Sequence, residues 1–419
     1  MIVVLMWKIN RFLQGKSRDM KPIKFYYDYI KYFGVRKLVS EIVKNIGIKI
    51  YPNTEEYNNI YNYTEDDILK NKKIIEKWNE TESKTINSIT WFVPAFYTPF
   101  AGIYTILEYV NFFASKDIIQ NLVLVGDNVA IEYCKNLLKN NTAITIYNET
   151  QLNDLPYTDI GIATSWGTAY YLLRFNNTKG KFYFIQDDER LHNPIGLEYM
   201  LAEQTYRFGF IGITNAKCLK EMVIKEFGGR AKNYYYTSKI YKPKEHKNKE
   251  WKLCFYSRPD NPRNGFNLGI EGLKEIHKRH PDVKIVNSGQ KTERLKEKYI
   301  TQLGKLSPKE LQEFYAGCDV GIYIVFSRHT GIIPFDLMMC GCAVLTNKRF
   351  YNETDLINME NCIMFEPTPS SIADCFDLIY NDRKIYKRIV DNGLKFTDSI
   401  PSIESEMNKI FNFMKNKYM

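Results

Sequence analysis

The stretch from Ser327 to Asn347 (SRHTGIIPFDLMMCGCAVLTN) constrains the fold of this chain more than any other segment. A polar loop leads to Pro334, which suits the first turn of a helix because a helix start leaves its N–H groups unpaired anyway. Gly341 is placed to end that helix, since glycine readily adopts the left-handed conformation found after a last turn. The apolar run at 343–345 predicts a buried strand. The segment therefore predicts one helix–strand unit of a parallel sheet.

The start of this predicted helix is a candidate anion site. The backbone N–H groups of Thr330 and Gly331 lie at its mouth, and unpaired amides together with the helix dipole attract phosphate. Asp336 follows one turn later, close to whatever group carries that phosphate. An ordinary strand–helix unit without a ligand explains the same pattern, so this segment alone does not decide between the two interpretations.

Strands and helices alternate in two series, which indicates two doubly wound parallel sheets with ligand sites at the carboxyl ends of their strands. The predicted strands of the two series are 89–93, 122–125, 159–163 and 181–185, and then 253–256, 283–286, 319–326 and 343–345. A linker rich in Tyr and Lys separates them. The predicted organisation is a helical extension (1–85), a first α/β domain (86–240), a second α/β domain (250–382) and helices that pack back across the domain junction (383–419).

Composition excludes several function classes. The 419 residues carry a formal net charge of +10, but the basic residues are interspersed with acidic ones, so the clustered basic stripe of a nucleic-acid-binding protein is absent from the sequence. The eight cysteines form no CxxC pair and the five histidines form no cluster, which argues against a zinc site or a disulfide scaffold. The apolar start, residues 1–7, is too short to span a bilayer. We expect a cytoplasmic protein, with peripheral contact at the inner face of the membrane as a secondary expectation.

A second group of polar residues follows the first strand of the second domain. Arg258 comes directly after that strand, and Arg263 follows in a loop that Pro259 and Pro262 stiffen. Guanidinium groups suit diphosphate oxygens because their planar fork donates two parallel hydrogen bonds. A surface loop with two solvated arginines is the alternative. The position at a strand's carboxyl end favours a diphosphate site.

An acidic run ends the predicted strand at 181–185 of the first domain. Asp187, Asp188 and Glu189 stand where the ligand edge of the sheet is expected, and Asp187 is the first candidate for catalysis at the acceptor. Further candidates for acceptor binding are His192 and Trp166. A solvated turn or a helix cap is the competing interpretation for each carboxylate taken alone.

Three separated segments together resemble a known family. They are 181–214, the loop SRPDNPRNGFNLGIEGL at 257–273, and 327–347. These segments resemble the WsaF-type rhamnosyltransferases, which are bacterial enzymes of surface polysaccharide synthesis in the GT4-like clan of GT-B glycosyltransferases. The resemblance implies a GT-B fold, with the nucleotide sugar held by the C-terminal domain and the glycan acceptor by the N-terminal domain.

Carried over position by position, the resemblance implies a donor site. Arg258 and Arg263 match the diphosphate-binding arginines, and Asp336 falls where the clan has a glutamate on the ribose or deoxyribose hydroxyls. The positions that match the donor-facing loop are His329, Thr330, Gly331 and Ile332. The positions expected around the nucleotide base are Ser288, Leu306 and Tyr315. The clan places a second glutamate eight residues before the ribose acid, where this chain has Arg328.

The expected function is therefore transfer of a sugar, rhamnose or another deoxysugar, from a nucleotide diphosphate donor to a glycan or lipid-linked glycan. Arginines and a helix start can stabilise the leaving diphosphate, so no metal ion or other cofactor is expected. The clan resemblance implies retention of the anomeric configuration. Two alternatives remain open: another GT-B enzyme such as a phosphorylase, for which no cofactor lysine is evident, and a catalytically silent glycan-binding protein, suggested by Arg328.

Overall fold

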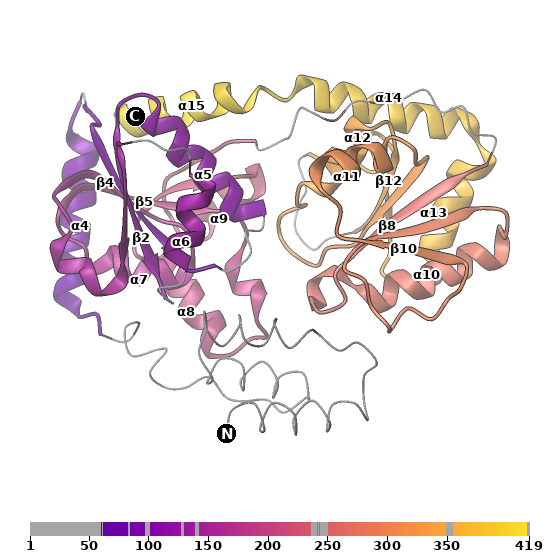
Figure 1. Cartoon of the computed structure of the whole chain (residues 1–419), viewed down its shortest axis with the longest axis horizontal. Helices are drawn as coiled ribbons and strands as arrows, with labels where there is room; N and C mark the ends of the chain where they lie inside the picture. The colour runs from indigo at the N-terminus through magenta and orange to yellow at the C-terminus, as the bar shows by residue number, and fades with distance from the viewer. Residues whose placement is uncertain are drawn as a thin grey trace.

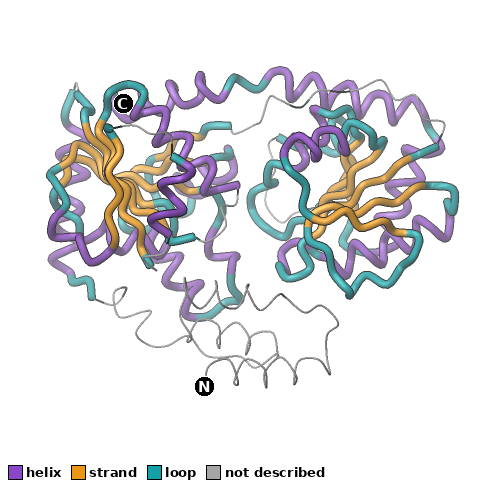
Figure 2. The backbone as a smooth tube through the Cα atoms, viewed as in Figure 1, coloured by secondary structure: helices purple, strands orange, loops and turns teal. Residues whose placement is uncertain are grey.

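The computed structural model of the chain describes residues 60, 62–82, 84–96, 101–126, 130–138, 142–235, 241, 243, 250–348 and 355–416. Most of the predicted N-terminal extension, including the apolar start considered for membrane contact, lies outside the described residues. Within them, no helix is long and apolar enough to cross a membrane. Two parallel sheets form the centres of two domains, with helices on their outer sides (Figure 1, Figure 2).

The N-terminal domain is built on seven parallel strands in the order β3-β2-β1-β4-β5-β6-β7. The strands are β1 (Ser88–Pro94), β2 (Ile119–Val125), β3 (Ile144–Asn148), β4 (Thr158–Ala163), β5 (Thr178–Ile185), β6 (Ile211–Thr214) and β7 (Ala231–Asn233). The helices of this domain are α4 (Glu65–Glu80), α5 (Ala101–Ala114), α6 (Ala130–Leu137), α7 (Trp166–Arg174), α8 (Leu197–Tyr206) and α9 (Lys217–Lys225). Short 3₁₀ turns lie at η1 (Glu149–Asp154) and η2 (Glu189–His192).

The C-terminal domain is built on six parallel strands in the order β10-β9-β8-β11-β12-β13. The strands are β8 (Lys252–Ser257), β9 (Lys284–Gly289), β10 (Ile300–Gly304), β11 (Val320–Tyr323), β12 (Ala343–Asn347) and β13 (Ile363–Phe365). Its other elements are η3 (Pro262–Asn264), α10 (Phe266–Arg279), α11 (Pro308–Tyr315), α12 (Ile333–Met339) and α13 (Pro369–Asn381). The predicted fold class, two doubly wound α/β domains, is confirmed.

Local sequence signals set the ends of the helices near the later site. Ser307 and Glu310 form a capping box at the start of α11, in which each side chain accepts a backbone N–H of the other residue. Gly341 ends α12 at φ +81°, and the N–H of Cys342 donates to the carbonyl of Leu337 at 3.0 Å. This pair of features is a Schellman cap, as the glycine predicted.

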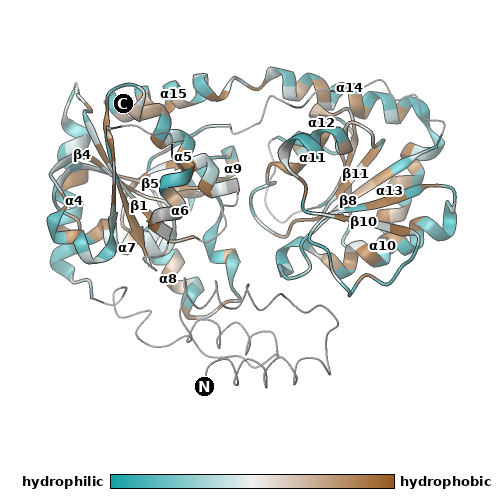
Figure 3. Ribbon diagram, in the orientation of Figure 1, coloured by the Kyte–Doolittle hydropathy of each residue, from teal (hydrophilic) through white to brown (hydrophobic). Residues whose placement is uncertain are grey.

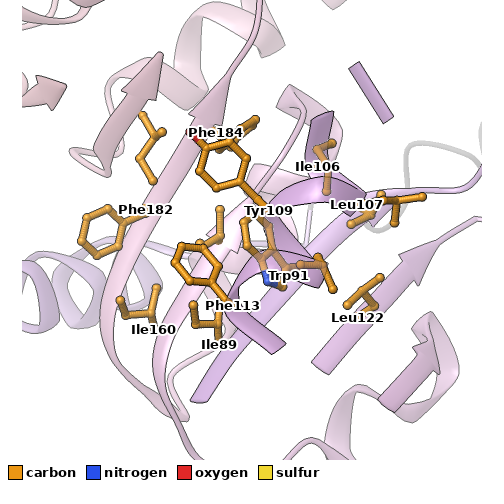
Figure 4. Close-up of a cluster of buried hydrophobic side chains, with 14 of the residues drawn as sticks. Ile89, Trp91, Ile106, Leu107, Tyr109, Phe113, Leu122, Ile160, Phe182 and Phe184 are labelled. Atoms are coloured by element: carbon orange, nitrogen blue, oxygen red, sulfur yellow. The ribbon is translucent and has the colours of Figure 1, made fainter. Parts of the chain in front are cut away.

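Each sheet is buried between helices, which explains why its strands are nearly continuously apolar (Figure 3). In the N-terminal domain, Trp91 of β1 packs with Phe113 of α5 and Phe184 of β5 (Figure 4). The indole N–H of Trp91 donates to the side chain of Gln120 at 2.8 Å, so this buried donor is satisfied. Both domains therefore hold their strand ends on rigid, packed sheets.

Two C-terminal helices connect the domains. Helix α14 (Arg383–Ser399) packs against α12 of the C-terminal domain. Helix α15 (Ile403–Lys415) places Met407, Ile410 and Met414 in the core of the N-terminal domain. These helices, yellow in Figure 1, run from one domain to the other and tie the last residues to the first sheet.

Candidate functional site

A cavity of about 670 Å³ lies between the two domains, which is the size of a small-molecule site. Its walls come from the carboxyl ends of strands in both sheets, where ligands of parallel α/β domains bind. The N-terminal domain contributes Pro94, Gly102, Ile103, Thr105, Ile106, Thr164, Ser165, Trp166, Gly167, Gln186, Asp187, Glu189, His192, Asn215 and Tyr235. The C-terminal domain contributes Tyr256, Arg258, Asn261, Arg263, Asn264, Tyr323, Val325, Ser327, His329, Gly331, Ile332, Ile333 and Phe335.

Most of the sequence-predicted site residues meet in this one cavity. From the acceptor group it collects Asp187, Glu189, His192 and Trp166, and from the donor group Arg258, Arg263, His329, Gly331 and Ile332. These residues were predicted from segments that together span positions 166 to 332. The structure therefore brings the two candidate groups together across the domain junction.

Asp187 is the residue at which the two domains touch inside the cavity. Its Oδ2 accepts from the guanidinium of Arg263 at 2.6 Å and lies 3.3 Å from Nε2 of His192. Its Oδ1 accepts from the hydroxyl of Ser327 and from the backbone N–H of Asp188 at 2.8 Å. Burial raises the pKa of this carboxyl, but the hydrogen bond and charge of His192 and the charges of His329 and Arg263 outweigh it and hold the pKa at about 2. Asp187 is therefore ionised at neutral pH.

The arginine loop after β8 is held in place from three directions. The side chain of Asn261 accepts the backbone N–H of Arg263 at 3.1 Å, and the carbonyl of Arg263 accepts the N–H of Phe326 at 2.7 Å. Gly265 follows at φ +52°, and a Cβ there would come within 2.7 Å of the Ile324 side chain. The loop thus presents Arg263 on a backbone that is already ordered, which lowers the entropy lost on binding an anion.

Glu189 lies at the same edge but in an apolar setting. Its Oε2 accepts the backbone N–H of Trp166 at 2.5 Å, and its own N–H donates to the hydroxyl of Tyr206 at 3.0 Å. Burial raises the pKa of Glu189 to about 7, although the charge of His192 and the Trp166 hydrogen bond oppose the rise. Glu189 therefore changes protonation near neutral pH.

This raised pKa predicts a pH-dependent stability. The unfolded chain ionises Glu189 near its ordinary pKa of 4.5, so the folded state loses stability as pH rises from there through about 7. Replacing Glu189 with glutamine removes the ionisation. We expect the free energy of unfolding of the variant, relative to that of the wild type, to rise by roughly 3 kcal/mol between pH 5 and pH 8. Urea unfolding of both proteins across this range measures the effect. A difference between them that does not change with pH would show that Glu189 titrates normally.

Asp188 corrects one expectation. It is fully buried and does not reach the cavity; it accepts from Arg190 at 2.8 and 2.7 Å and from Nε of Arg328 at 3.1 Å. Arg190 and Arg328 also contact Glu226, at 3.0 and 2.6 Å. Because Arg328 belongs to the C-terminal domain, this ion network joins the domains. Asp188 therefore has a structural position and no surface to offer an acceptor.

The donor-side expectations also need corrections. Thr330 is 2% exposed and outside the cavity wall, and the N–H of Gly331 already donates to Nδ1 of His329 at 2.9 Å. Asp336 is buried inside α12, where its Oδ1 has no hydrogen-bond partner among the described residues. Burial raises the pKa of Asp336 well above its usual range, and its position inside α12 keeps it away from the cavity wall.

The residues expected around a nucleotide base do not line this cavity either. Ser288 and Tyr315 are completely buried, and Leu306 packs against the apolar cluster between α11 and α12. Tyr315 lies on the face of α11 that packs into the core of the C-terminal domain. That same burial removes it from a ligand surface in this structure.

Several wall residues were missed from the sequence. Ser165, Gln186 and Asn215 each stand one or two positions after the end of a strand, β4, β5 and β6. The rule that ligands bind at strand carboxyl ends could have found all three. Ser327 gave no such signal, because its hydrogen bond to Asp187 spans 140 positions.

Within the described part of the chain, no group of three or more His, Cys, Asp or Glu side chains is arranged to hold a metal ion. The expected independence from metal thus stays a prediction. Two residues that line the cavity, Arg258 and Arg263, carry guanidinium groups.

Comparison with known sequences connects this geometry to a family. Residues 251–377 match the family model described as WsaF, C-terminal domain. Over 350 residues the chain is 31% identical to the O-antigen biosynthesis protein RfbC of Myxococcus xanthus. That match covers 79% of this chain but 27% of RfbC, so the chain spans about a quarter of the length of this relative.

Solved structures identify the fold. HepE from Anabaena, in complex with UDP and glucose, matches with a TM-score of 0.63 at 12% identity, over 79% of this chain and 99% of HepE. A TarM variant from S. aureus, in complex with UDP and other ligands, matches with a TM-score of 0.61 at 11% identity, over 78% and 100%. Sucrose-phosphate synthase from Thermosynechococcus elongatus matches with a TM-score of 0.58 at 11% identity, over 78% and 98%. The chain has the fold of GT-B glycosyltransferases, and the predicted resemblance is confirmed for that fold and for the C-terminal domain.

Proposed function

We propose that this chain is a glycosyltransferase of bacterial surface polysaccharide synthesis, which moves a sugar from a nucleoside diphosphate to a glycan. The observation that carries the proposal is the meeting of Arg263 and Asp187, from opposite domains, at 2.6 Å inside one cavity. A cation for the leaving group and an ionised carboxylate for the acceptor are then within reach of one reacting centre. The O-antigen role in the name of RfbC and the UDP complexes of HepE and TarM support this proposal.

On the donor side, Arg258 and Arg263 bind the diphosphate. Their guanidinium forks donate paired hydrogen bonds to its oxygens and neutralise the charge that grows as it leaves. The bond between the anomeric carbon and the diphosphate oxygen breaks, and its electron pair leaves with the diphosphate. Preorganised charge of this kind costs no reorganisation at the moment of reaction.

On the acceptor side, Asp187 accepts a hydrogen bond from the hydroxyl that attacks the anomeric carbon, and the proton of that hydroxyl is taken up by the departing diphosphate. Glu189, His192 and Trp166 line the same wall, which supports a role for them in contacts with other parts of the glycan. Rhamnose or another deoxysugar as the donor, a lipid-linked acceptor, retention of configuration and work at the inner face of the membrane are the finer parts of the proposal. The resemblance to the WsaF-type rhamnosyltransferases motivates the choice of sugar.

Transfer without a divalent metal is the expected result of the direct assay. Purified protein is incubated with a panel of UDP-, dTDP- and GDP-sugars and a glycan acceptor, and release of the nucleoside diphosphate is measured with and without EDTA. Because two arginines supply the positive charge, EDTA is expected to leave the rate unchanged. Loss of activity in EDTA, restored by magnesium or manganese, contradicts this part of the proposal.

A catalytically silent glycan-binding protein is the second candidate. The observation that favours it is Arg328, since the clan has an acid at this position and this chain has a cation in an ion pair with Asp188. Such a protein binds the glycan but neither hydrolyses nor transfers a nucleotide sugar. Titration with the glycan, combined with the transfer assay, separates the two functions.

A further inference from the structure

The carboxylate of Asp187 is shared between the two domains in a regular way. Oδ1 has one partner in its own domain, the backbone N–H of Asp188, and one in the other, the hydroxyl of Ser327. Oδ2 likewise has His192 in its own domain and Arg263 in the other. Each oxygen is thus held by one contact within the N-terminal domain and one contact across the junction.

This arrangement leaves Asp187 no capacity for an acceptor. An ionised carboxylate has about four lone-pair positions, and four partners already use them. The same contact engages Nη1 of Arg263, one of the donors that would otherwise face a diphosphate. Two groups that the proposed reaction needs separately therefore neutralise each other in this structure.

We propose that the donor diphosphate replaces Asp187 on Arg263, and that this exchange releases Asp187 to receive the acceptor hydroxyl, so that the substrates bind in order with the donor first. The inference rests on the proposed function. It adds that the carboxylate of Asp187 competes with the diphosphate for Arg263. The contacts that break are those across the junction, to Arg263 and Ser327. The contacts that remain, to His192 and the Asp188 N–H, keep Asp187 oriented within its own domain.

The exchange has a physical reason to proceed. A diphosphate carries more negative charge than one carboxylate and offers oxygens to both Arg258 and Arg263, which stand five positions apart on one ordered loop. The side chains of Asp187 and Arg263 are 20% and 25% exposed, so an incoming anion can reach their contact from the cavity. The free energy of donor binding is therefore reduced by the cost of breaking the ion pair between Asp187 and Arg263.

Removal of the internal competitor tests the inference. Calorimetric titration with UDP, dTDP and GDP compares the wild type with Asp187→Asn, which keeps the size of the side chain but removes its charge. The variant is expected to bind the preferred diphosphate about tenfold more tightly, or about 1.4 kcal/mol. Asp187→Ala is expected to shift affinity in the same direction and replaces the asparagine variant if that one does not fold.

Two further variants identify the cause. In an Arg263→Gln background, Asp187→Asn is expected to leave affinity unchanged, because the two side chains act through one contact. Asp260→Asn is the matched control: it removes a negative charge from the same loop, where the side chain pairs with Gln290 instead of an arginine. It is expected to change affinity less than about twofold.

The outcomes separate this inference from the proposed function. Equal or weaker binding by both Asp187 variants, beside measurable binding by the wild type, overturns the exchange and leaves the donor site standing. An equal gain in Asp260→Asn assigns the effect to general charge and also overturns it. Failure of the wild type to bind any of the three diphosphates removes the proposed function itself, and the exchange with it.

Discussion

Replacement of Asp188 by alanine is expected to destabilise the protein by about 3–5 kcal/mol, the cost of breaking a buried ion network by removing one partner. Asp188 is fully buried and accepts hydrogen bonds from Arg190 and Arg328. The side chains of Arg190 and Arg328 are each 8% exposed. Without Asp188, the one carboxylate that both of them contact is Glu226. Urea unfolding followed by tryptophan fluorescence measures the loss.

A surface ion pair provides the matched control for Asp188. Asp66 pairs with Lys70 at 2.6 Å, but both side chains are more than half exposed, so Asp66→Ala is expected to cost less than about 0.5 kcal/mol. If Asp188→Ala unfolds within 1 kcal/mol of the wild type, the network does not hold the domains together. Asp188→Ala is not expected to change nucleotide affinity directly, because Asp188 lies outside the cavity wall.

Arg258→Ala and Arg263→Ala are each expected to weaken binding of a nucleoside diphosphate by roughly 1.5–3 kcal/mol, the range for a charged hydrogen bond. Both side chains line the cavity, and the loop that carries them is fixed by Asn261 and Phe326. Isothermal titration gives the dissociation constants directly. Because Arg263 also holds Asp187, its variant is the more informative of the two for the acceptor side.

An arginine elsewhere on the same domain controls for net charge. Arg279 of α10 pairs with Asp374 and Asp377 at 2.7 and 2.8 Å and is not part of the cavity wall. Arg279→Ala is expected to leave nucleotide affinity unchanged. Wild-type affinity in both Arg258→Ala and Arg263→Ala would place the donor site elsewhere.

The sequence could predict features that depend on neighbouring residues or that recur in all parallel sheets. Pro334 and Gly341 identified a helix because proline and glycine restrict or permit particular backbone angles regardless of the rest of the chain. The arginine loop and Asp187 could be placed because strand carboxyl ends of parallel sheets face ligands in general. These rules need no knowledge of distant partners, and residues from both candidate groups line one cavity.

What the sequence could not predict depends on pairs far apart in the chain. Nothing near Asp188 indicates that Arg328, 140 positions away, would make it a buried ion partner instead of a ligand for an acceptor. Asp187 was assigned to the acceptor alone, because its contact with Arg263 spans 76 positions. Asp336 was assigned to a ribose by position, whereas the rotation of α12 turns it inward. Depth of burial, which decides the positions of Asp188 and Asp336, is a property of the assembled domains.

Thermal unfolding of the wild-type protein with a panel of nucleotides tests the central claim, that the cavity between the domains binds a nucleoside diphosphate, most directly. A ligand that binds only the native state adds about 2.7 kcal/mol at a hundred times its dissociation constant, which is easily seen as a rise in Tm. The account predicts a rise with at least one of UDP, dTDP and GDP, a smaller rise with the matching monophosphate, and none with the diphosphate in the Arg258→Ala/Arg263→Ala double variant. No rise with any diphosphate at millimolar concentration, or an equal rise in the double variant, would contradict it.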